Sequence, residues 1–168
     1  MAPAGVATFG PKAGANTLKM TEKRVSFTLE STLDSVNMAE EKTEQLAAEL
    51  GFSEEDCHRL AMAVREAMVN AVLHGNAYDP KKKVHVAFEQ HGKTLTIVIG
   101  DEGRGLDEDD LPNPLAPENL LKQSGRGIFL MRSFMDDVRI KNLHPGTEVR
   151  LIKTVGGTAA DTTEEQQR

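Results

Sequence analysis

REAMVNAVLHGN, residues 65–76, reads as the second half of a helix that carries a polar stripe on an apolar body. Glu66, Asn70 and His74 are four residues apart, so each lies about 40° around the helix and about 6 Å along it from the one before. A buried carboxylate and a buried amide need partners, and an amide oxygen is a suitable ligand for Mg²⁺. The stripe is therefore either a magnesium site or a solvated helix face, and the spacing alone favours the solvated face.

The chain before this stretch predicts one strand and two helices. Apolar residues alternate with polar ones over 25–29, which indicates a half-buried strand. Helical spacing predicts a helix over 33–50 that ends at Gly51. Ser53 then begins the helix that runs through the polar stripe to Gly75.

The chain after Gly75 predicts further strands, interrupted by a long loop. Alternating apolar residues indicate four strands, around 84–88, 95–99, 138–140 and 149–151. A loop rich in glycine and proline spans 100–127, and a short helix follows from about Ile128 to Met135. This order predicts a two-layer α/β (α+β) sandwich, with a mixed, mostly antiparallel sheet and helices on one face.

The composition indicates one globular domain. The chain has 168 residues, and its apolar residues together with the glycines make up about 47%, the ordinary globular range. The two ends are rich in small and polar residues without a period, so they cannot bury enough apolar surface to become ordered. We expect a disordered arm over 1–22, a folded domain over 23–155 and a disordered tail over 156–168.

Charge and cysteine content narrow the function classes. The net charge is −6, and an acidic chain lacks the broad positive surface that nucleic acid demands. Cys57 is the single cysteine, which excludes an internal disulfide and fits a reducing compartment. No apolar run approaches the roughly 20 residues that span a bilayer. We expect a cytoplasmic protein that binds neither nucleic acid nor membrane.

Two glycine-bearing clusters flank the long loop. DEGRG, residues 101–105, follows a strand, where a carboxylate can accept a hydrogen bond while bare backbone approaches a flat ligand such as adenine. SGRG, residues 124–127, opens the next helix, where free N–H groups favour phosphate, and Lys122 and Arg126 could add charge. Each cluster alone is explained equally well by a surface turn or by solvated residues. The stretch between them, from about Leu106 to Ser124, is long enough to predict a functional lid.

The order of these motifs resembles the GHKL ATPase superfamily, which comprises gyrase-type ATPases, heat-shock chaperone ATPases, histidine kinases and MutL-type proteins. The order is E-x-x-x-N on a helix, D-x-G-x-G after a strand, a lid, G-x-G before a helix, and G-T entering the last strand. The resemblance covers about residues 24–153. Within it SGRGIFLMRSFMDDV, residues 124–138, looks most like bacterial anti-sigma-factor serine kinases. The resemblance implies the Bergerat ATP-binding fold, with ATP and Mg²⁺ as cofactors.

The resemblance also implies roles for single residues. Asn70 matches the family's magnesium-binding asparagine, and Glu66 matches its general base. Asp101 matches the aspartate that accepts a hydrogen bond from the adenine amino group, and Thr147 matches a threonine that supports adenine binding. The other residues expected to bind the cofactor are Gly103 and Gly105 around the adenine, and Lys122, Ser124, Gly125, Arg126 and Gly127 at the phosphate lid.

Members of this branch bind a sigma factor in competition with an anti-anti-sigma protein of the STAS type, which they phosphorylate on serine, and they commonly form homodimers. The resemblance therefore implies an ATP-dependent protein serine/threonine kinase that acts as an anti-sigma factor. The alternative is a nucleotide-gated regulatory binding module without phosphotransfer. Glu66 weighs against that alternative, because a base matters only if a hydroxyl must lose a proton.

Overall fold

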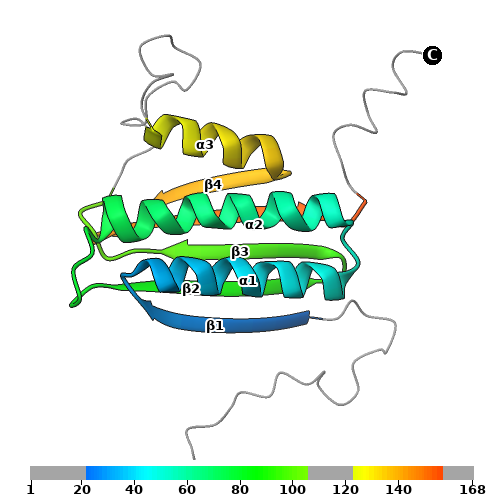
Figure 1. The fold of residues 1–168 in the computed structure, drawn as a ribbon, viewed down its shortest axis with the longest axis horizontal. Coiled ribbons are helices and arrows are strands. Elements are labelled where there is room, and N and C mark those ends of the chain that lie inside the picture. Colours follow the sequence, from blue (N-terminus) through cyan, green and yellow to red (C-terminus); the bar gives the residue numbers. More distant parts are fainter. Residues whose placement is uncertain (1–21, 106–122, 157–168) are drawn as a thin grey trace, which may run out of the picture.

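The computed structural model describes residues 22–105 and 123–156, which form the two-layer sandwich that the sequence predicts (Figure 1). The strands are β1 (Glu22–Glu30), β2 (Lys83–His91), β3 (Thr94–Gly100), β4 (Asp137–Asn142) and β5 (Thr147–Thr154). They make one five-stranded sheet in the order β1-β2-β3-β5-β4. Every pairing in this described sheet is antiparallel, so it is more uniform than the mixed, mostly antiparallel sheet that we expected.

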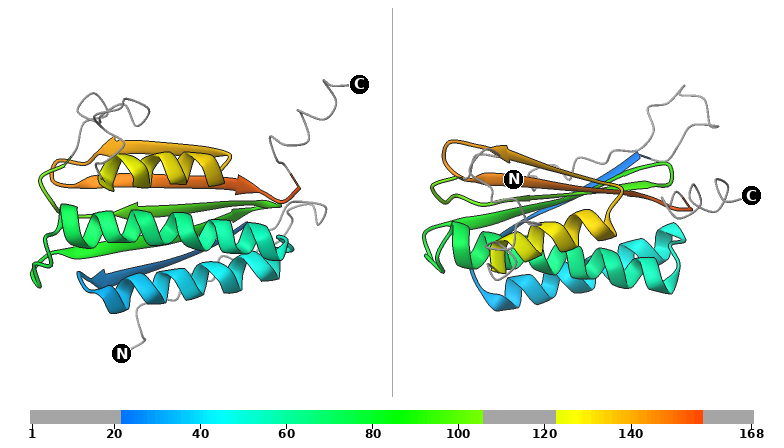
Figure 2. Two further views of the ribbon diagram at one scale, coloured as in Figure 1. Left: turned by 45° about the horizontal axis from the view of Figure 1, so that its top comes forward. Right: turned by 90° about the horizontal axis from the view of Figure 1, so that it is seen from above.

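Helices cover one face of the sheet (Figure 2). They are α1 (Leu33–Leu50), α2 (Glu54–Val69), the π-helical segment η1 (Asn70–Gly75) and α3 (Gln123–Phe134). Side-chain caps fix where the first two begin, because Thr32 accepts from the N–H of Ser35 and Ser53 accepts from the N–H of Asp56. Gly51 ends α1 in the left-handed conformation, with φ 96°.

The core lies between the sheet and α2, the central helix. Figure 1 shows α1 near the β1 edge, α3 near the β4 edge and α2 between them. Leu60, Val64 and Met68 of α2 are fully buried in one cluster with Ile97 of β3 and Leu151 of β5. Burial of each such side chain stabilises the fold by about 1.5–3 kcal/mol. This packing fixes α2, and therefore the polar stripe that it carries, against the sheet.

Two local expectations need correction. The last helix begins at Gln123, earlier than the expected start near Ile128, so Gly125 and Gly127 lie within it. Glycine costs about 1 kcal/mol in a helix interior, which is why the pattern placed this start too late. The first strand is less buried than expected, with Val25 37% exposed, because β1 is an edge strand and has a neighbour on one side only.

Most of the expected arm (1–22), tail (156–168) and lid (106–124) lies outside the described residues. The parts that are described are residue 22 of the arm, residue 156 of the tail and residues 123–124 of the lid. Within the described ranges, no helix is both long enough and apolar enough to cross a membrane.

Candidate functional site

The polar stripe of α2 runs into η1. Glu66 lies near the end of α2, and Asn70 is the first residue of η1. Both are half-buried, whereas His74 is exposed. A π-helical turn that continues an α-helix is frequent at functional sites. The stripe is thus neither fully buried in the core nor wholly solvated, because Glu66 and Asn70 face another element.

That element is α3, which brings Gly127 against the pair. A Cβ atom at position 127 would lie 2.8 Å from Oε2 of Glu66 and 3.5 Å from Nδ2 of Asn70. Gly127 is buried, and its missing side chain leaves the α3 backbone within reach of both polar groups. A carboxylate, an amide and bare backbone thus meet where α2 faces α3.

Asp101 is 7% exposed and directly follows β3. Its Oδ1 accepts from the backbone N–H of Gly103 at 2.9 Å and from that of Thr147 at 3.2 Å. Burial raises the pKa of Asp101 above its ordinary value, and these two backbone hydrogen bonds oppose the rise. Oδ2 makes no hydrogen bond within the described part of the chain. The carboxylate is therefore fixed through one oxygen, while the other can accept from a ligand.

Three glycines bring backbone into contact around Asp101. A Cβ at Gly75 would overlap the Asp101 carboxylate, and one at Gly103 would overlap the carbonyl of Gly75. A Cβ at Gly146, in the β4–β5 turn, would overlap the carbonyl of Asp101. Gly146 also has φ 101°, a conformation that favours glycine. As a result η1, the 101–105 loop and the β4–β5 turn approach one another closely around the Asp101 carboxylate.

The geometry suits a purine nucleotide with a metal-bound polyphosphate. A buried carboxylate oxygen beside bare backbone can accept from the exocyclic amine of a flat base. The described residues hold no group of three His, Cys, Asp or Glu side chains that could bind a metal by themselves. A magnesium site on Asn70 would need further oxygens, and nucleotide phosphates and water commonly supply them.

The comparison with known families agrees with this geometry. The family model described as a histidine kinase-like ATPase domain matches residues 29–153. The chain belongs to this family. Serine-protein kinase RsbW of Bacillus subtilis (strain 168) is 31% identical over 122 residues, which are 69% of this chain and 76% of that protein. Anti-sigma F factor of Anoxybacillus flavithermus is 34% identical over 111 residues, 63% of this chain and 75% of that protein. These relatives place the ATPase domain in the anti-sigma-factor kinase branch.

A solved structure supports the fold. The RsbU and RsbW domains of Rv1364c from Mycobacterium tuberculosis match with a TM-score of 0.59 and 22% sequence identity. The match covers 82% of this chain and 34% of that one. At this identity the likeness concerns the fold alone, the α+β sandwich of the histidine kinase-like ATPases.

The ATPase domain brings the predicted site residues together in two groups. Glu66, Asn70 and Gly127 meet at the α2–α3 contact, and Asp101, Gly103 and Thr147 meet at the end of β3. Thr147 contacts Asp101 through its backbone, since its N–H donates to the carboxylate and its carbonyl accepts from the N–H of Asp101.

The remaining predicted residues have mixed outcomes. Gly105 has φ 90° and packs against Asn142, because a Cβ there would overlap Oδ1 of that residue. Arg126 is exposed on α3. Lys122 lies outside the described residues, and for Ser124 and Gly125 only the helical backbone is described.

The site also contains four residues that local sequence patterns did not single out as site residues, namely Gly75, Asn76, Glu102 and Gly146. Gly75 and Asn76 stand directly after the polar stripe, and the prediction treated this glycine only as the end of a helix. A small residue followed by an amide at that point was a usable signal for a close approach of two backbones. Gly146 was assigned only to a turn, because its contact with Asp101 joins residues far apart in the sequence.

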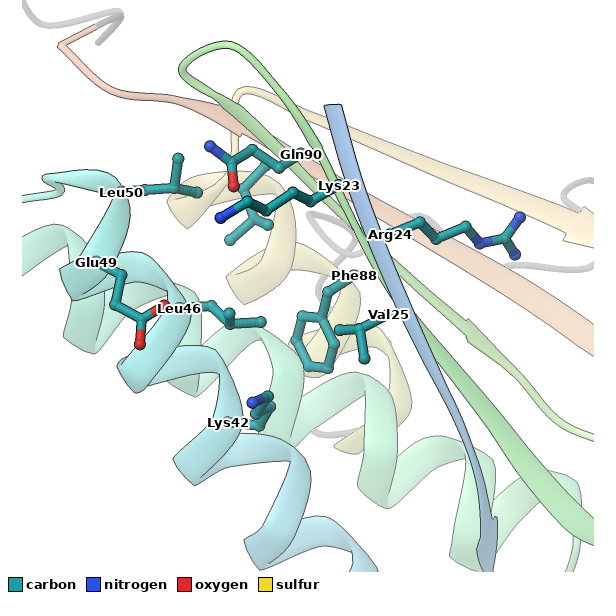
Figure 3. A pocket seen from close by; sticks show the side chains of 10 residues that line it. Lys23, Arg24, Val25, Lys42, Leu46, Glu49, Leu50, Phe88 and Gln90 are labelled. Atoms are coloured by element: carbon teal, nitrogen blue, oxygen red, sulfur yellow. The ribbon is translucent and has the colours of Figure 1, made fainter. Parts of the chain in front are cut away.

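A cavity of about 390 Å³ lies elsewhere, between α1 and the β1–β2 pair (Figure 3). Its apolar lining includes Leu46 and Leu50 of α1 and Leu95 of β3. In Figure 3 Lys23 points toward α1, whereas Arg24 points away from it. Leu95 lies near the start of β3 and Asp101 follows its end, so about 20 Å of strand separates them. The cavity is therefore distinct from the candidate nucleotide site.

Proposed function

We propose that this protein is an ATP-dependent serine kinase that phosphorylates an anti-anti-sigma protein and sequesters a sigma factor. The observation that carries the proposal is the meeting of Glu66, Asn70 and Gly127 where α2 faces α3. A base beside the phosphate-binding backbone accelerates serine phosphotransfer, whereas a module that only binds nucleotide has no proton to remove.

Asp101 binds the adenine end of the nucleotide in this proposal. The N–H groups of Gly103 and Thr147 hold Oδ1, so the carboxylate keeps one orientation. Oδ2 accepts from the adenine amine. Guanine presents a carbonyl at the same place, and two acceptors facing each other leave a buried polar group unpaired, which costs about 1–3 kcal/mol or more. We expect ATP to bind at least about tenfold better than GTP.

Glu66 and Asn70 act at the phosphate end. When bound, ATP supplies the transferable phosphoryl group and Mg²⁺ neutralises charge on its phosphates. Asn70 offers its amide oxygen to the metal, and the bare backbone at Gly127 leaves room for phosphate oxygens. Glu66 would orient the serine hydroxyl of the substrate and accept its proton as the hydroxyl oxygen bonds to the γ-phosphorus. The bond from that phosphorus to the rest of the nucleotide would break, and ADP would be the leaving group.

The partners that we propose follow from membership of the anti-sigma-factor kinase branch. The relatives are named for serine-protein kinase activity and for action against a sigma factor. We extend both activities to this chain, with a STAS-type anti-anti-sigma protein as substrate and a sigma factor as the sequestered partner. The proposal includes a homodimer and a cytoplasmic location, without direct contact to nucleic acid.

Phosphate transfer tests the proposal. The purified chain is incubated with γ-labelled ATP, Mg²⁺ and candidate anti-anti-sigma proteins, and a parallel pull-down with ATP or ADP identifies bound partners. Label on a serine of the anti-anti-sigma protein is the expected result. If the partner binds in a nucleotide-dependent way but no phosphate is transferred, the kinase proposal is wrong and the protein is a nucleotide-gated binding module.

A further inference from the structure

Asn76 is completely buried, although asparagine is usually exposed. It follows Gly75, the last residue of η1. Within the described part of the chain, its side chain makes no hydrogen bond to Asp101, Glu66 or Asn70. A buried amide must be hydrogen-bonded or it is strongly unfavourable. The hydrogen-bond partners of Asn76 therefore indicate which parts of the fold it connects.

The Asn76 side chain joins three segments. Its Nδ2 donates to Oγ of Ser31 at 2.9 Å and to the carbonyl of Lys83 at 3.0 Å. Its Oδ1 accepts from the backbone N–H of Glu102 at 2.8 Å. Ser31 lies between β1 and α1, Lys83 begins β2, and Glu102 follows Asp101. One amide thus ties the 101–105 loop to the frame of the sheet.

The backbone of Asn76 is equally constrained. Its N–H donates to the carbonyl of Ala71, and its carbonyl accepts from the N–H of Asp79. The next two residues, Ala77 and Tyr78, have φ of 50° and 57°, which non-glycine residues adopt only when their surroundings hold them there. The amide of Asn76 is therefore aimed by a rigid turn.

Glu102 is held from its other side as well. Its carboxylate accepts from the N–H of Lys83 at 2.6 Å and lies 3.5 Å from Nε2 of His85. The hydrogen bond from Lys83 lowers the pKa of Glu102. Glu102 is thus held by two hydrogen bonds, one from its N–H to Asn76 and one from the N–H of Lys83 to its carboxylate. Because Asp101 is the preceding residue, these bonds also restrict the backbone orientation of Asp101.

We infer that Asn76 is a positioning residue for base recognition, because its hydrogen bond to the N–H of Glu102 sets the direction in which Asp101 presents Oδ2. The inference rests on the proposed function, since it assumes that Asp101 contacts adenine. Asn76 controls affinity for the base and the preference for adenine over guanine. It leaves the phosphate end, built from α2 and α3, unchanged.

The test compares Asn76→Ala with Ser31→Ala, a matched control. Ser31→Ala removes a partner of the same amide on the side away from the loop and keeps the bond to Glu102. ATP and GTP affinities are measured by calorimetry beside the melting temperature, together with KM for ATP and kcat. We expect Asn76→Ala to weaken ATP binding about tenfold or more and to reduce the ATP-to-GTP preference. Its kcat at saturating ATP should stay within about twofold of the parent, and Ser31→Ala should keep the parental preference.

Asn76→Asp provides the rescue, because its carboxylate still accepts from Glu102 while the donation to Ser31 and Lys83 is lost. It should recover most of the ATP-to-GTP preference despite lower stability. Should Asn76→Ala not fold, the smaller deletion Asn76→Ser takes its place in the comparison. An unchanged preference in the deletion variant, or an equal loss in Ser31→Ala, would overturn the inference. Failure of the parent itself to bind ATP would instead reject the proposed function.

Discussion

Gly127 of α3 faces Glu66 of α2 so closely that a Cβ at position 127 would lie 2.8 Å from the carboxylate oxygen Oε2. The two residues are 61 positions apart, and only the packing of α3 on α2 brings them together. The glycine therefore provides space for the group that we propose as the base, in addition to any space that it provides for phosphate.

Gly127→Ala should separate binding from transfer. The new Cβ meets the far end of a flexible side chain, so the fold survives while the carboxylate moves. Displacement of a reacting group by about 1 Å can cost about a hundredfold in rate. We expect phosphate transfer to fall about tenfold or more and ATP affinity to fall by a smaller factor, because the new methyl group also takes some of the space proposed for phosphate oxygens. Parallel calorimetry and single-turnover transfer give the result, and parental transfer by the variant would contradict it.

Gly75→Ala should weaken nucleotide binding. Its Cβ would overlap the Asp101 carboxylate, which two backbone N–H groups hold in place and which therefore cannot withdraw cheaply. We expect a loss of ATP affinity of tenfold or more, since a lost buried hydrogen bond costs about 1–3 kcal/mol. Gly51→Ala is the matched control, because its Cβ meets open space and its φ of 96° makes alanine costly for stability alone. Similar ATP affinities in the two variants would argue against the contact.

Asp101 gives the site a pH dependence of defined sign. Burial raises its folded-state pKa above the unfolded value, so the folded state binds this proton more tightly. The charged carboxylate therefore costs stability above the folded pKa. This cost decreases as pH falls through the folded pKa and is absent below the unfolded pKa. ATP binding changes in the opposite direction, since a proton on Oδ2 would make that oxygen an O–H donor where the adenine amine needs an acceptor.

Melting temperatures with and without ATP, measured from neutral pH downward, test this dependence. Stabilisation by ATP should decline as pH approaches the raised pKa. Asp101→Asn does not titrate at this position, so the same decline should be absent from its profile. Parallel profiles for the parent and this variant would show that another group is responsible.

Asn70→Ala should lose most of the magnesium-dependent part of ATP affinity while the protein stays folded. Asn70 is half-buried at the start of η1, and its amide lies beside Gly127. Calorimetry in Mg²⁺ and in chelator measures the difference that the metal makes. His74→Ala, one turn further on and exposed, should keep that difference. Equal affinities for Asn70→Ala and the parent in Mg²⁺ would remove Asn70 from the site.

The sequence predicted the elements well where the pattern is local. Alternation at Leu95, Ile97 and Ile99 indicates β3, and all three side chains are buried. Gly51 and Ser53 mark helix ends by backbone conformation and capping, which need no tertiary contact. The helix start at Gln123 was placed wrongly, because glycine disfavours a helix locally and only packing on α2 overrides that preference.

The site was predictable in part for the same reason. Glu66 and Asn70 share a helix, so their spacing alone brings them together, and Asp101 stands out at a strand end. The contacts of Gly75 with Asp101, of Gly146 with Asp101 and of Asn76 with Glu102 join segments 26 to 45 residues apart. Such contacts follow from the sheet order and the loop conformations, which local periodicity does not contain.

The central claim is that Glu66 is the base of a serine kinase, and single-turnover phosphate transfer by Glu66→Ala tests it most directly. We expect this variant to bind Mg-ATP within a few-fold of the parent and to keep sigma-factor binding. Transfer to the serine of the anti-anti-sigma protein should fall by about a hundredfold or more. Glu55→Ala, an exposed glutamate of the same helix, should transfer at the parental rate. Parental transfer by Glu66→Ala would contradict the account, and loss of ATP binding in that variant would assign Glu66 a structural role instead.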